Sequence, residues 1–254
     1  MWEYAVIVKN SNEQIISYIL SSSKIFVSKL GGVATLNRED EFSHVVIGVD
    51  EKHKDKMQTF LSKCITRAIC SFFKSDYLDK HLNIKIADKI GLLAFKKALI
   101  NFDKETDYYI VSKNLVFENN LYLESFYDFR LKKLRDKWGE LIDLANENKE
   151  YLISSDAFMD LLKFLIDNID IAEEEIDIVE DDDGYRIFSG NEENSFEGLS
   201  NEGLVSSVIE ISPQKINLYC KKENSATQLL KQIYEQRVNL KFKAQNEMIN
   251  IIKL

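Results

Sequence analysis

The chain has 254 residues, of which 45% are apolar and 30% are charged, proportions that are ordinary for a globular protein. This length can bury a substantial core, as one large domain or as two smaller ones. The chain holds only nine glycines and one proline. That scarcity argues against glycine-rich ligand loops and proline-rich linkers, and it favours helices with short connections.

The formal net charge of −9 is concentrated in one segment. Residues 173–202 hold 12 acidic residues and one basic residue, Arg186, so this segment carries −11 and the rest of the chain +2. Acidic surface disfavours the phosphate contacts that dominate nonspecific nucleic-acid binding. We therefore do not expect nucleic acid as the partner, although the nearly neutral remainder has room for a basic patch.

The cysteines and the N-terminus predict a cytoplasmic protein. Three cysteines do not make a disulfide framework, and their odd number is typical of a reducing compartment: Cys64, Cys70 and Cys220. The start of the chain, Met1–Val8, is too short and has the wrong flanks for a signal sequence. No run approaches the roughly 20 apolar residues that a transmembrane helix needs.

The first third of the chain predicts a β-α-β-β unit. Tyr4–Val8 is a β-branched run typical of a strand. A helical stripe follows at Ile15, Ile16, Ile19 and Leu20. After Gly31-Gly32, the runs Val33–Leu36 and His44–Val49 predict a hairpin.

The middle of the chain predicts helices. One apolar face recurs at offsets of three and four: Met57, Phe60, Leu61, Cys64, Ile65, Ala68 and Phe72. A second helix is expected over Ile84–Phe102, and a short extended run over Asp107–Val111. The motif Phe126-Tyr127-Asp128-Phe129-Arg130-Leu131 then opens a helix with an apolar stripe: Leu131, Leu134, Trp138, Leu141 and Ala145. Such a stripe packs against another helix, within one chain or in a homodimer.

The last third predicts a β-β-α-β-α-β unit. Its first two strands, Ile176–Glu180 and Tyr185–Phe188, flank Asp181-Asp182-Asp183-Gly184, in which Gly184 can supply the positive φ of a tight turn. An acidic loop is expected over 191–203. The remaining elements are a helix, a strand, a helix and a strand: Leu204–Ile211, Lys215–Cys220, Ala226–Gln236 and Val238–Phe242. A short helix is expected after Lys243.

These elements together predict an α+β fold, with an N-terminal β-α-β-β unit, a helical middle and a C-terminal β-β-α-β-α-β unit. We place the boundary between two regions at residue 110. Residues 1–110 form an N-terminal α+β region with a helical part. Residues 111–254 form a second region of helices followed by a small mixed sheet.

The order of four features resembles the YtxC-like family, which is associated with sporulation in endospore-forming bacteria. The features are the F-x-x-F-R-L helix, the acidic hairpin, Ser212-Pro213-x-Lys215-Ile216 and Arg237-Val238. The resemblance covers roughly residues 118–243. It implies a cytosolic protein in a spore-forming bacterium, and it carries over no catalytic residue.

The acidic hairpin has three interpretations. Its carboxylates are the hard oxygen ligands that Mg²⁺ or Ca²⁺ prefers, and Asp177, Glu180 and Asp183 are the candidates for a metal site. The pattern does not fit an EF-hand loop. A solvated turn is the favoured interpretation. A charged recognition surface at Asp181, Asp182 and Asp183 is the further alternative.

A basic run lies on the motif helix: Arg130, Lys132, Lys133, Arg135 and Lys137. With the apolar stripe it makes an amphipathic helix of the kind that binds nucleic acid or an anionic membrane. Acidic residues are interleaved with it, which favours a solvent-facing side with i,i+4 pairs. Arg130 stands between apolar residues, and for it we favour a buried ion pair with Glu124, Asp128 or the acidic hairpin over anion binding.

No catalytic motif is present. The three histidines, His44, His53 and His81, and the three cysteines form no arrangement that nucleophilic catalysis or zinc binding would need. We therefore expect a non-enzymatic binding or regulatory protein without a cofactor and with a protein partner. The alternatives are a metal-dependent phosphoesterase or nuclease that uses converging carboxylates, and a nucleic-acid-binding protein that uses residues 130–137.

Overall fold

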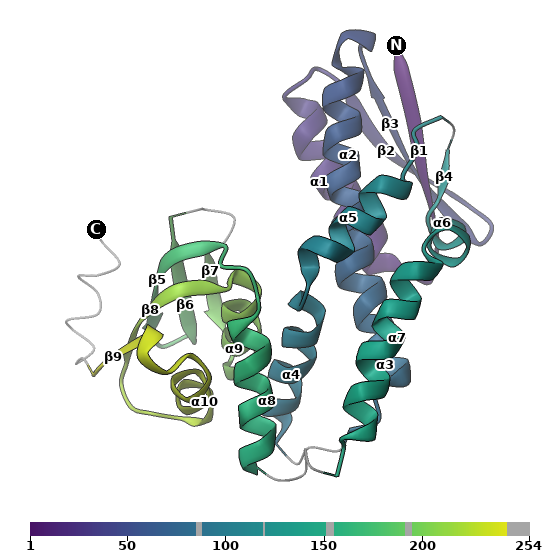
Figure 1. Cartoon of the computed structure of the whole chain (residues 1–254). Helices are drawn as coiled ribbons and strands as arrows, with labels where there is room; N and C mark the ends of the chain where they lie inside the picture. Colours follow the sequence, from purple (N-terminus) through teal and green to yellow (C-terminus); the bar gives the residue numbers. More distant parts are fainter. Residues whose placement is uncertain (85–87, 119, 151–154, 191–194, 243–254) are drawn as a thin grey trace. The chain divides into compact units, whose positions relative to one another are not determined.

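The computed structural model describes residues 1–84, 88–118, 120–150, 155–190 and 195–242 (Figure 1). The chain forms two compact units, and each unit is assembled from two segments. Unit 1 contains residues 1–82 and 104–144, and unit 2 contains residues 83–103 and 145–254. The chain therefore passes between the units three times, and the units do not coincide with the regions 1–110 and 111–254 of the sequence analysis.

Unit 1 contains a four-stranded sheet with the order β2-β3-β1-β4. Its strands are β1 (Trp2–Lys9), β2 (Val33–Glu39), β3 (Phe42–Val49) and β4 (Leu121–Tyr122). Strand β3 is antiparallel to both β1 and β2, whereas β4 is parallel to β1. The parallel pairing is possible because a long helical excursion separates β1 from β4.

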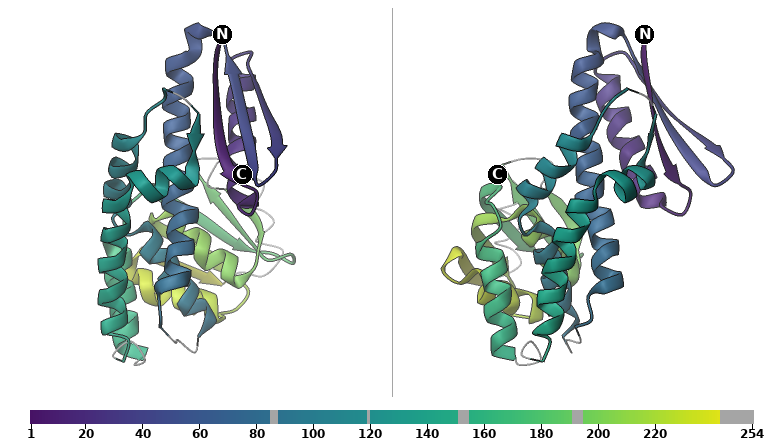
Figure 2. Two further views of the ribbon diagram at one scale, coloured as in Figure 1. Left: turned by 90° about the vertical axis from the view of Figure 1, so that its right-hand side faces the viewer. Right: turned by 45° about the vertical axis from the view of Figure 1, so that its right-hand side comes forward.

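The helices of unit 1 come from both of its segments. They are α1 (Glu13–Ser28), α2 (Lys54–Ala68), α3 (Lys74–His81), α5 (Lys104–Asn114), α6 (Leu123–Arg130) and α7 (Lys132–Glu147), the last belonging to unit 1 up to Leu144. A π-helical segment, Ile69–Phe73, joins α2 to α3. Helices α1 and α2 lie on the same face of the sheet (Figure 2).

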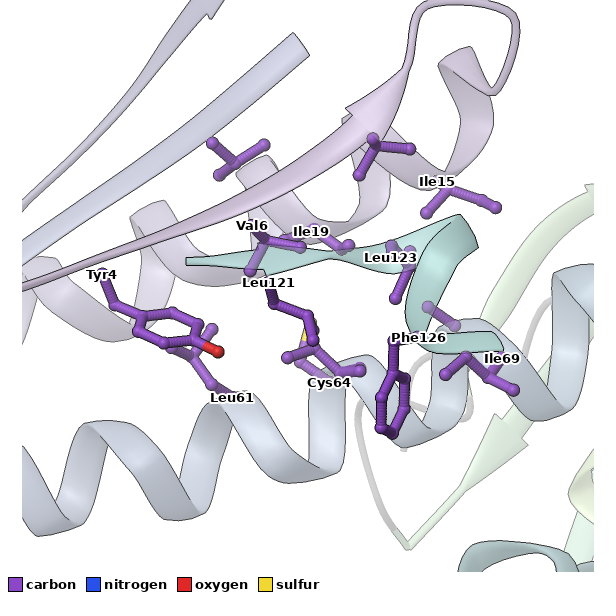
Figure 3. Close-up of a cluster of buried hydrophobic side chains, with 14 of the residues drawn as sticks. Tyr4, Val6, Ile15, Ile19, Leu61, Cys64, Ile69, Leu121, Leu123 and Phe126 are labelled. Atoms are coloured by element: carbon purple, nitrogen blue, oxygen red, sulfur yellow. The ribbon is translucent and has the colours of Figure 1, made fainter. Parts of the chain in front are cut away.

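The core of unit 1 lies between the sheet and these helices. Figure 3 shows side chains of β1, α1, α2, β4 and α6 in contact there, among them Tyr4, Ile19, Leu61 and Phe126. The apolar stripe of the motif helix packs into the same core through Leu131, Leu134 and Trp138. That part of the stripe is therefore used within the chain.

Unit 2 contains a five-stranded mixed sheet with the order β7-β6-β5-β8-β9. Its strands are β5 (Glu173–Glu180), β6 (Tyr185–Ser189), β7 (Phe196–Leu199), β8 (Pro213–Cys220) and β9 (Val238–Phe242). Strands β5, β8 and β9 run parallel, and β5, β6 and β7 form an antiparallel meander. Strand β7 lies where the sequence predicted only a loop.

The helices of unit 2 are α4 (Lys89–Asn101), α8 (Ser155–Asp167), α9 (Asn201–Ile211) and α10 (Ser225–Tyr234). Side-chain hydrogen bonds and one left-handed residue determine where three of these helices begin or end. The Asp88 carboxylate accepts hydrogen bonds from the first-turn amides of α4, and Asn224 and Thr227 form a capping box on α10. Ser212 adopts a left-handed conformation with φ 48° and ends α9 immediately before Pro213.

The α+β fold is confirmed. The β-α-β-β order of the N-terminal strands and helix is observed, and the C-terminal order is observed with β7 added. The extended run predicted over Asp107–Val111 is wrong, because these residues lie in α5. The helix predicted over Ile84–Phe102 begins later, at Lys89, where Asp88 caps it. The helix expected after Lys243 and the part of the acidic loop at 191–194 lie outside the described residues.

We predict that Gly184→Ala destabilises unit 2 by about 1–3 kcal/mol, because a left-handed φ and a blocked Cβ position act together. Gly184 has a φ of 130°, and an added Cβ would collide with the carbonyl oxygen of Leu199. Gly190→Ala is the control, since a Cβ there meets nothing within 4 Å. Urea denaturation measures both. Equal stability of the two variants would contradict the prediction.

Candidate functional site

A groove of about 320 Å³ lies beside the F-x-x-F-R-L motif in unit 1. Its walls come from the segment after α5, from β4 and from α6, and they include Val116, Tyr122, Phe129 and Arg130. Phe126 and Leu131 of the motif are buried in the core, whereas Phe129 is 82% exposed. The motif therefore divides its aromatic residues between the core and the surface.

The exposed side of the groove is apolar. Val116 and Tyr122 are among the exposed large hydrophobic residues of the chain, together with Phe129. Among the described residues, no acidic side chain lines the groove. A contiguous apolar surface of this kind is more typical of a binding site than single exposed hydrophobic residues are.

Arg130 lies at this groove and not in a buried ion pair. Its side chain is exposed, and it makes no ion pair with any residue that the structure describes. Glu124, one of the expected partners, instead accepts hydrogen bonds from the backbone N–H of Lys9 at 2.9 Å and from Nδ2 of Asn12 at 2.6 Å. The prediction of a buried ion pair for Arg130 is therefore wrong, and a cation remains available at the groove.

The basic run does not lie on one helix. Helix α6 ends at Arg130, Leu131 has a non-helical φ of −108° and ψ of 32°, and α7 starts at Lys132. The Arg135 guanidinium donates to the carbonyl oxygens of Tyr127 and Asp128, the second at an Nη2–O distance of 2.8 Å. Arg135 thus satisfies carbonyls at the C-terminus of α6 that no longer have helical partners.

The remaining basic residues of the run have different environments. Lys132 forms an exposed i,i+4 ion pair with Asp136 at 2.7 Å, as the interleaved charges indicated. Lys133 is exposed. Lys137 is directed to Asp107, at 2.7 Å. The run is therefore not a continuous basic surface.

Asp107 is the centre of a buried polar cluster in unit 1. Its carboxylate accepts hydrogen bonds from Lys74 Nζ at 2.7 Å, from Lys137 Nζ at 2.7 Å and from the indole Nε1 of Trp138 at 2.9 Å. The side chains of Asp107 and Lys74 are 0% and 2% exposed. Helices α3, α5 and α7 are thereby joined through one carboxylate.

The buried environment of this cluster shifts the pKa values of Lys74 and of the neighbouring Cys70. Burial lowers the pKa of the Lys74 ammonium, and the Asp107 carboxylate opposes that change. Burial also raises the pKa of the neighbouring Cys70 thiol to about 12, and the negative charge of Asp107 adds to that shift. The π-helical segment ends immediately before Lys74.

Sequence reasoning missed this cluster. Asp107 was assigned to an extended run, and Lys74 had no pattern that set it apart from solvated lysines. The feature of the sequence that could have revealed the cluster is Asp107 itself, because it lies on the same helix face as Val111, one turn later. A carboxylate on a buried helix face requires a cation or another donor close by.

Three carboxylates of β5 and the acidic turn form ion pairs with cations of unit 2. The Lys221 ammonium lies 2.8 Å from Asp182 Oδ1, Lys215 lies 2.6 Å from Glu175 Oε1, and Arg186 pairs with Asp181. The backbone N–H of Asp183 donates to Asp181 Oδ1 at 2.9 Å, which closes the turn. These contacts make Asp181 and Asp182 parts of a local ion network.

The candidate metal ligands Asp177, Glu180 and Asp183 are not brought together. Asp177 accepts from Asn217 Nδ2 at 3.0 Å, and Glu180 accepts from the backbone N–H of Lys221 at 2.7 Å. An offset of three residues places Asp177 and Glu180 on opposite faces of β5. In the part of the chain that the structure describes, no group of three or more metal-ligating side chains has a suitable arrangement.

No family model matches this chain, and no curated protein or solved structure matches it. The resemblance to the YtxC-like family therefore stays a prediction. Within the described residues, no helix combines the length and the apolar character that a membrane crossing requires.

We predict that Asp107→Asn lowers the free energy of unfolding by about 3–5 kcal/mol, because Lys74 then keeps a buried charge without a counter-ion. Lys137→Met is the matched control, since it leaves the pair of Lys74 and Asp107 intact, and we expect it to cost only about 1–2 kcal/mol. Urea denaturation at neutral pH measures both. A cost for Asp107→Asn no larger than that for Lys137→Met would show that the cluster is not needed.

The buried thiols predict a loss of stability at alkaline pH. Burial raises the pKa of Cys64 to about 11 and that of Cys70 to about 12, from an ordinary value of 9.0. The folded state therefore holds these protons more tightly than the unfolded state does. The resulting stabilisation is complete below pH 9 and is lost as the pH rises through 11 to 12. Cys70→Ala should make the free energy of unfolding fall less steeply as the pH rises from 9 to 12. An unchanged slope would contradict a raised pKa for the Cys70 thiol in the folded state.

Proposed function

We propose that this chain is a non-enzymatic binding protein and that a protein partner docks in the groove formed by β4 and α6. The observation that carries the proposal is Phe129, a phenylalanine 82% exposed beside a cation that has no ion-pair partner among the described residues. Exposed aromatic residues and arginines are the side chains that most often dominate binding energy at interfaces.

The groove also indicates the chemistry of the partner. Its apolar wall suits an apolar side chain, and Arg130 suits a carboxylate next to it, since the guanidinium presents paired donors that match a carboxylate. We therefore propose a protein segment in which an apolar residue and an acidic residue are neighbours. Docking would place the apolar residue on Phe129 and the carboxylate on Arg130.

The two alternative functions have less support. A nucleic-acid site on residues 130–137 would need free basic side chains, yet Arg135, Lys132 and Lys137 all have partners within unit 1. A metal-dependent hydrolase would need converging carboxylates, and Asp177 and Glu180 are each held by other groups. The resemblance to the YtxC-like family supports placing the binding protein in the cytoplasm during sporulation.

We predict that Phe129→Ala and Arg130→Glu each weaken partner binding by about tenfold or more without loss of stability, because both side chains are exposed. Affinity purification from sporulating cells with mass spectrometry identifies the partner, and titration of the purified pair measures affinity. The matched controls are Phe164→Ala, an exposed phenylalanine on α8, and Lys133→Glu, an exposed cation on α7.

The proposal requires one specific pattern of results. A protein must be retained by the unaltered chain and by both controls, and it must be lost or weakened with both groove variants. Binding that is unchanged by Phe129→Ala and Arg130→Glu would exclude the groove as the docking site. Turnover of a small molecule or phosphoester that a single substitution abolishes would contradict the non-enzymatic role.

A further inference from the structure

A second groove of unit 1, with a volume of about 220 Å³, lies between α2 and α5, which pack side by side (Figure 1). Each helix contributes three lining residues: Ser62, Lys63 and Thr66 from α2, and Tyr108, Tyr109 and Ser112 from α5. Five of these side chains end in a hydroxyl group and the sixth ends in an ammonium group. Every lining side chain can therefore donate a hydrogen bond. We call this the hydroxyl groove.

The Thr66 hydroxyl is a buried polar group without a partner. Thr66 is 2% exposed, and its Oγ1 makes no hydrogen bond with any residue that the structure describes. A threonine in a helix can satisfy its hydroxyl by donating to the carbonyl oxygen one turn earlier, as Thr59 does to Asp55 at 2.9 Å. Thr66 does not, and an unpaired buried hydroxyl lowers stability. An occupant of the hydroxyl groove supplies the missing acceptor.

The lining residues differ in depth. Thr66 is the one buried residue among them, so it forms the floor of the groove. The exposed residues Lys63 and Tyr109 stand at the rim. The Tyr109 hydroxyl accepts a hydrogen bond from Lys113 Nζ at 3.4 Å and therefore keeps its own proton for another acceptor. Donors are thus available at the floor and at the rim.

The rim of the hydroxyl groove is positively charged. Lys63 forms no ion pair with another residue that the structure describes. The ammonium group of Lys113 lies 5.5 Å from the centroid of the Tyr109 ring, and that of Lys104 lies 5.6 Å from the centroid of the Tyr108 ring. Three ammonium groups therefore surround a groove that is lined by hydroxyl groups.

The acidic residues of the two helices lie away from the groove. Asp55 precedes Ser62 by seven residues, and Glu105 precedes Ser112 by seven, which is roughly 10 Å along each helix axis. Asp107 is buried in the polar cluster with Lys74. None of these carboxylates lines the groove. The lining donors and the lysines therefore favour an anion.

We propose that the hydroxyl groove binds a phosphate monoester or free phosphate. Lysine ammonium groups and the hydroxyls of serine, threonine and tyrosine are the side chains that contact phosphate oxygens in nucleic-acid complexes. A phosphate group carries close to two negative charges at neutral pH and three strongly accepting oxygens, whereas a carboxylate carries one charge and two oxygens. The groove also exceeds the roughly 30 Å³ that one water molecule occupies. Phosphate pairs with Lys63 and accepts hydrogen bonds from Thr66 and Tyr109.

Isothermal titration calorimetry of the full chain with inorganic phosphate tests the proposal. Sodium chloride holds the ionic strength constant, because exposed lysines attract any anion. We expect one site with a dissociation constant of the order of 1 mM. Lys63→Met should weaken binding about tenfold or more. Lys56→Met is the control, since Lys56 is an exposed lysine of α2 that does not line the groove, and its effect should stay within about twofold.

Thr66→Val separates a binding role from a structural one. It keeps the shape of the side chain and removes the unpaired hydroxyl, so the phosphate-free variant should melt at the same temperature as the unaltered chain or higher. Its dissociation constant for phosphate should rise about fivefold or more. Thr59→Val is the matched control on the same helix and should leave phosphate binding unchanged, because the Thr59 hydroxyl is already paired.

Adenosine 5′-monophosphate distinguishes the two sources of the phosphate group. Binding about tenfold tighter than that of inorganic phosphate assigns the groove to a nucleotide, whose base stacks on the Tyr109 ring, 62% of which residue is exposed. Tyr109→Leu should then remove the gain. Equal or weaker binding of the nucleotide assigns the groove to free phosphate.

Three results overturn the proposal: no binding at about 20 mM phosphate, equal affinity for acetate and phosphate, or the same loss of affinity in Lys63→Met and Lys56→Met. A Thr66→Val variant that is folded and binds phosphate as the unaltered chain does also contradicts it. None of the six lining residues lines the groove beside Phe129. Failure here therefore leaves the proposed function standing.

Discussion

The carboxylate of Asp107 lies fully buried in unit 1, and the helices around it must supply both counter-charges and hydrogen-bond donors. Three donors do so, from α3 and α7, and each is fixed by a direct hydrogen bond. A buried ion pair of this kind adds little net stability compared with apolar packing, but it strongly penalises arrangements in which the charge loses a partner. The register of α3, α5 and α7 follows from that penalty.

The position of the groove beside Phe129 depends on this arrangement. Asp107 holds Lys137 and Trp138, and these residues fix the start of α7 against the core. The chain must therefore turn between α6 and α7, which it does at Leu131, and Arg135 satisfies the carbonyls that the turn exposes. The same turn leaves Phe129 and Arg130 at the end of α6, on the surface. A straight helix through residues 123–147 would have given these two residues other neighbours.

The sequence predicted the parts of the fold that depend on local patterns. The β-branched runs of β1 and β3 and the apolar stripes of α1 and α2 are all visible in residue type and spacing. It did not predict what depends on distant residues. Asp107 is buried on α5 where Lys74, Lys137 and Trp138 donate hydrogen bonds to its carboxylate, and Arg130 is exposed because the chain turns one residue later. Strand β7 was missed because four residues, two of them glycine and glutamate, carry no alternating pattern of their own.

The discontinuous units constrain how this chain folds as it is synthesised. Helix α4 leaves the ribosome early, but its buried side chains, such as Phe95, pack on α8 and α9, and α9 ends at Ile211. About 110 further residues must be made first, which takes roughly 5–20 s at about 5–20 residues per second. During that interval the apolar face of α4 has no native partner. Both segments of unit 1, which precede and follow α4 in the sequence, are complete once Leu144 has been synthesised. The nascent chain thus carries one exposed apolar helix between two finished segments, and this is the state that a chaperone would encounter.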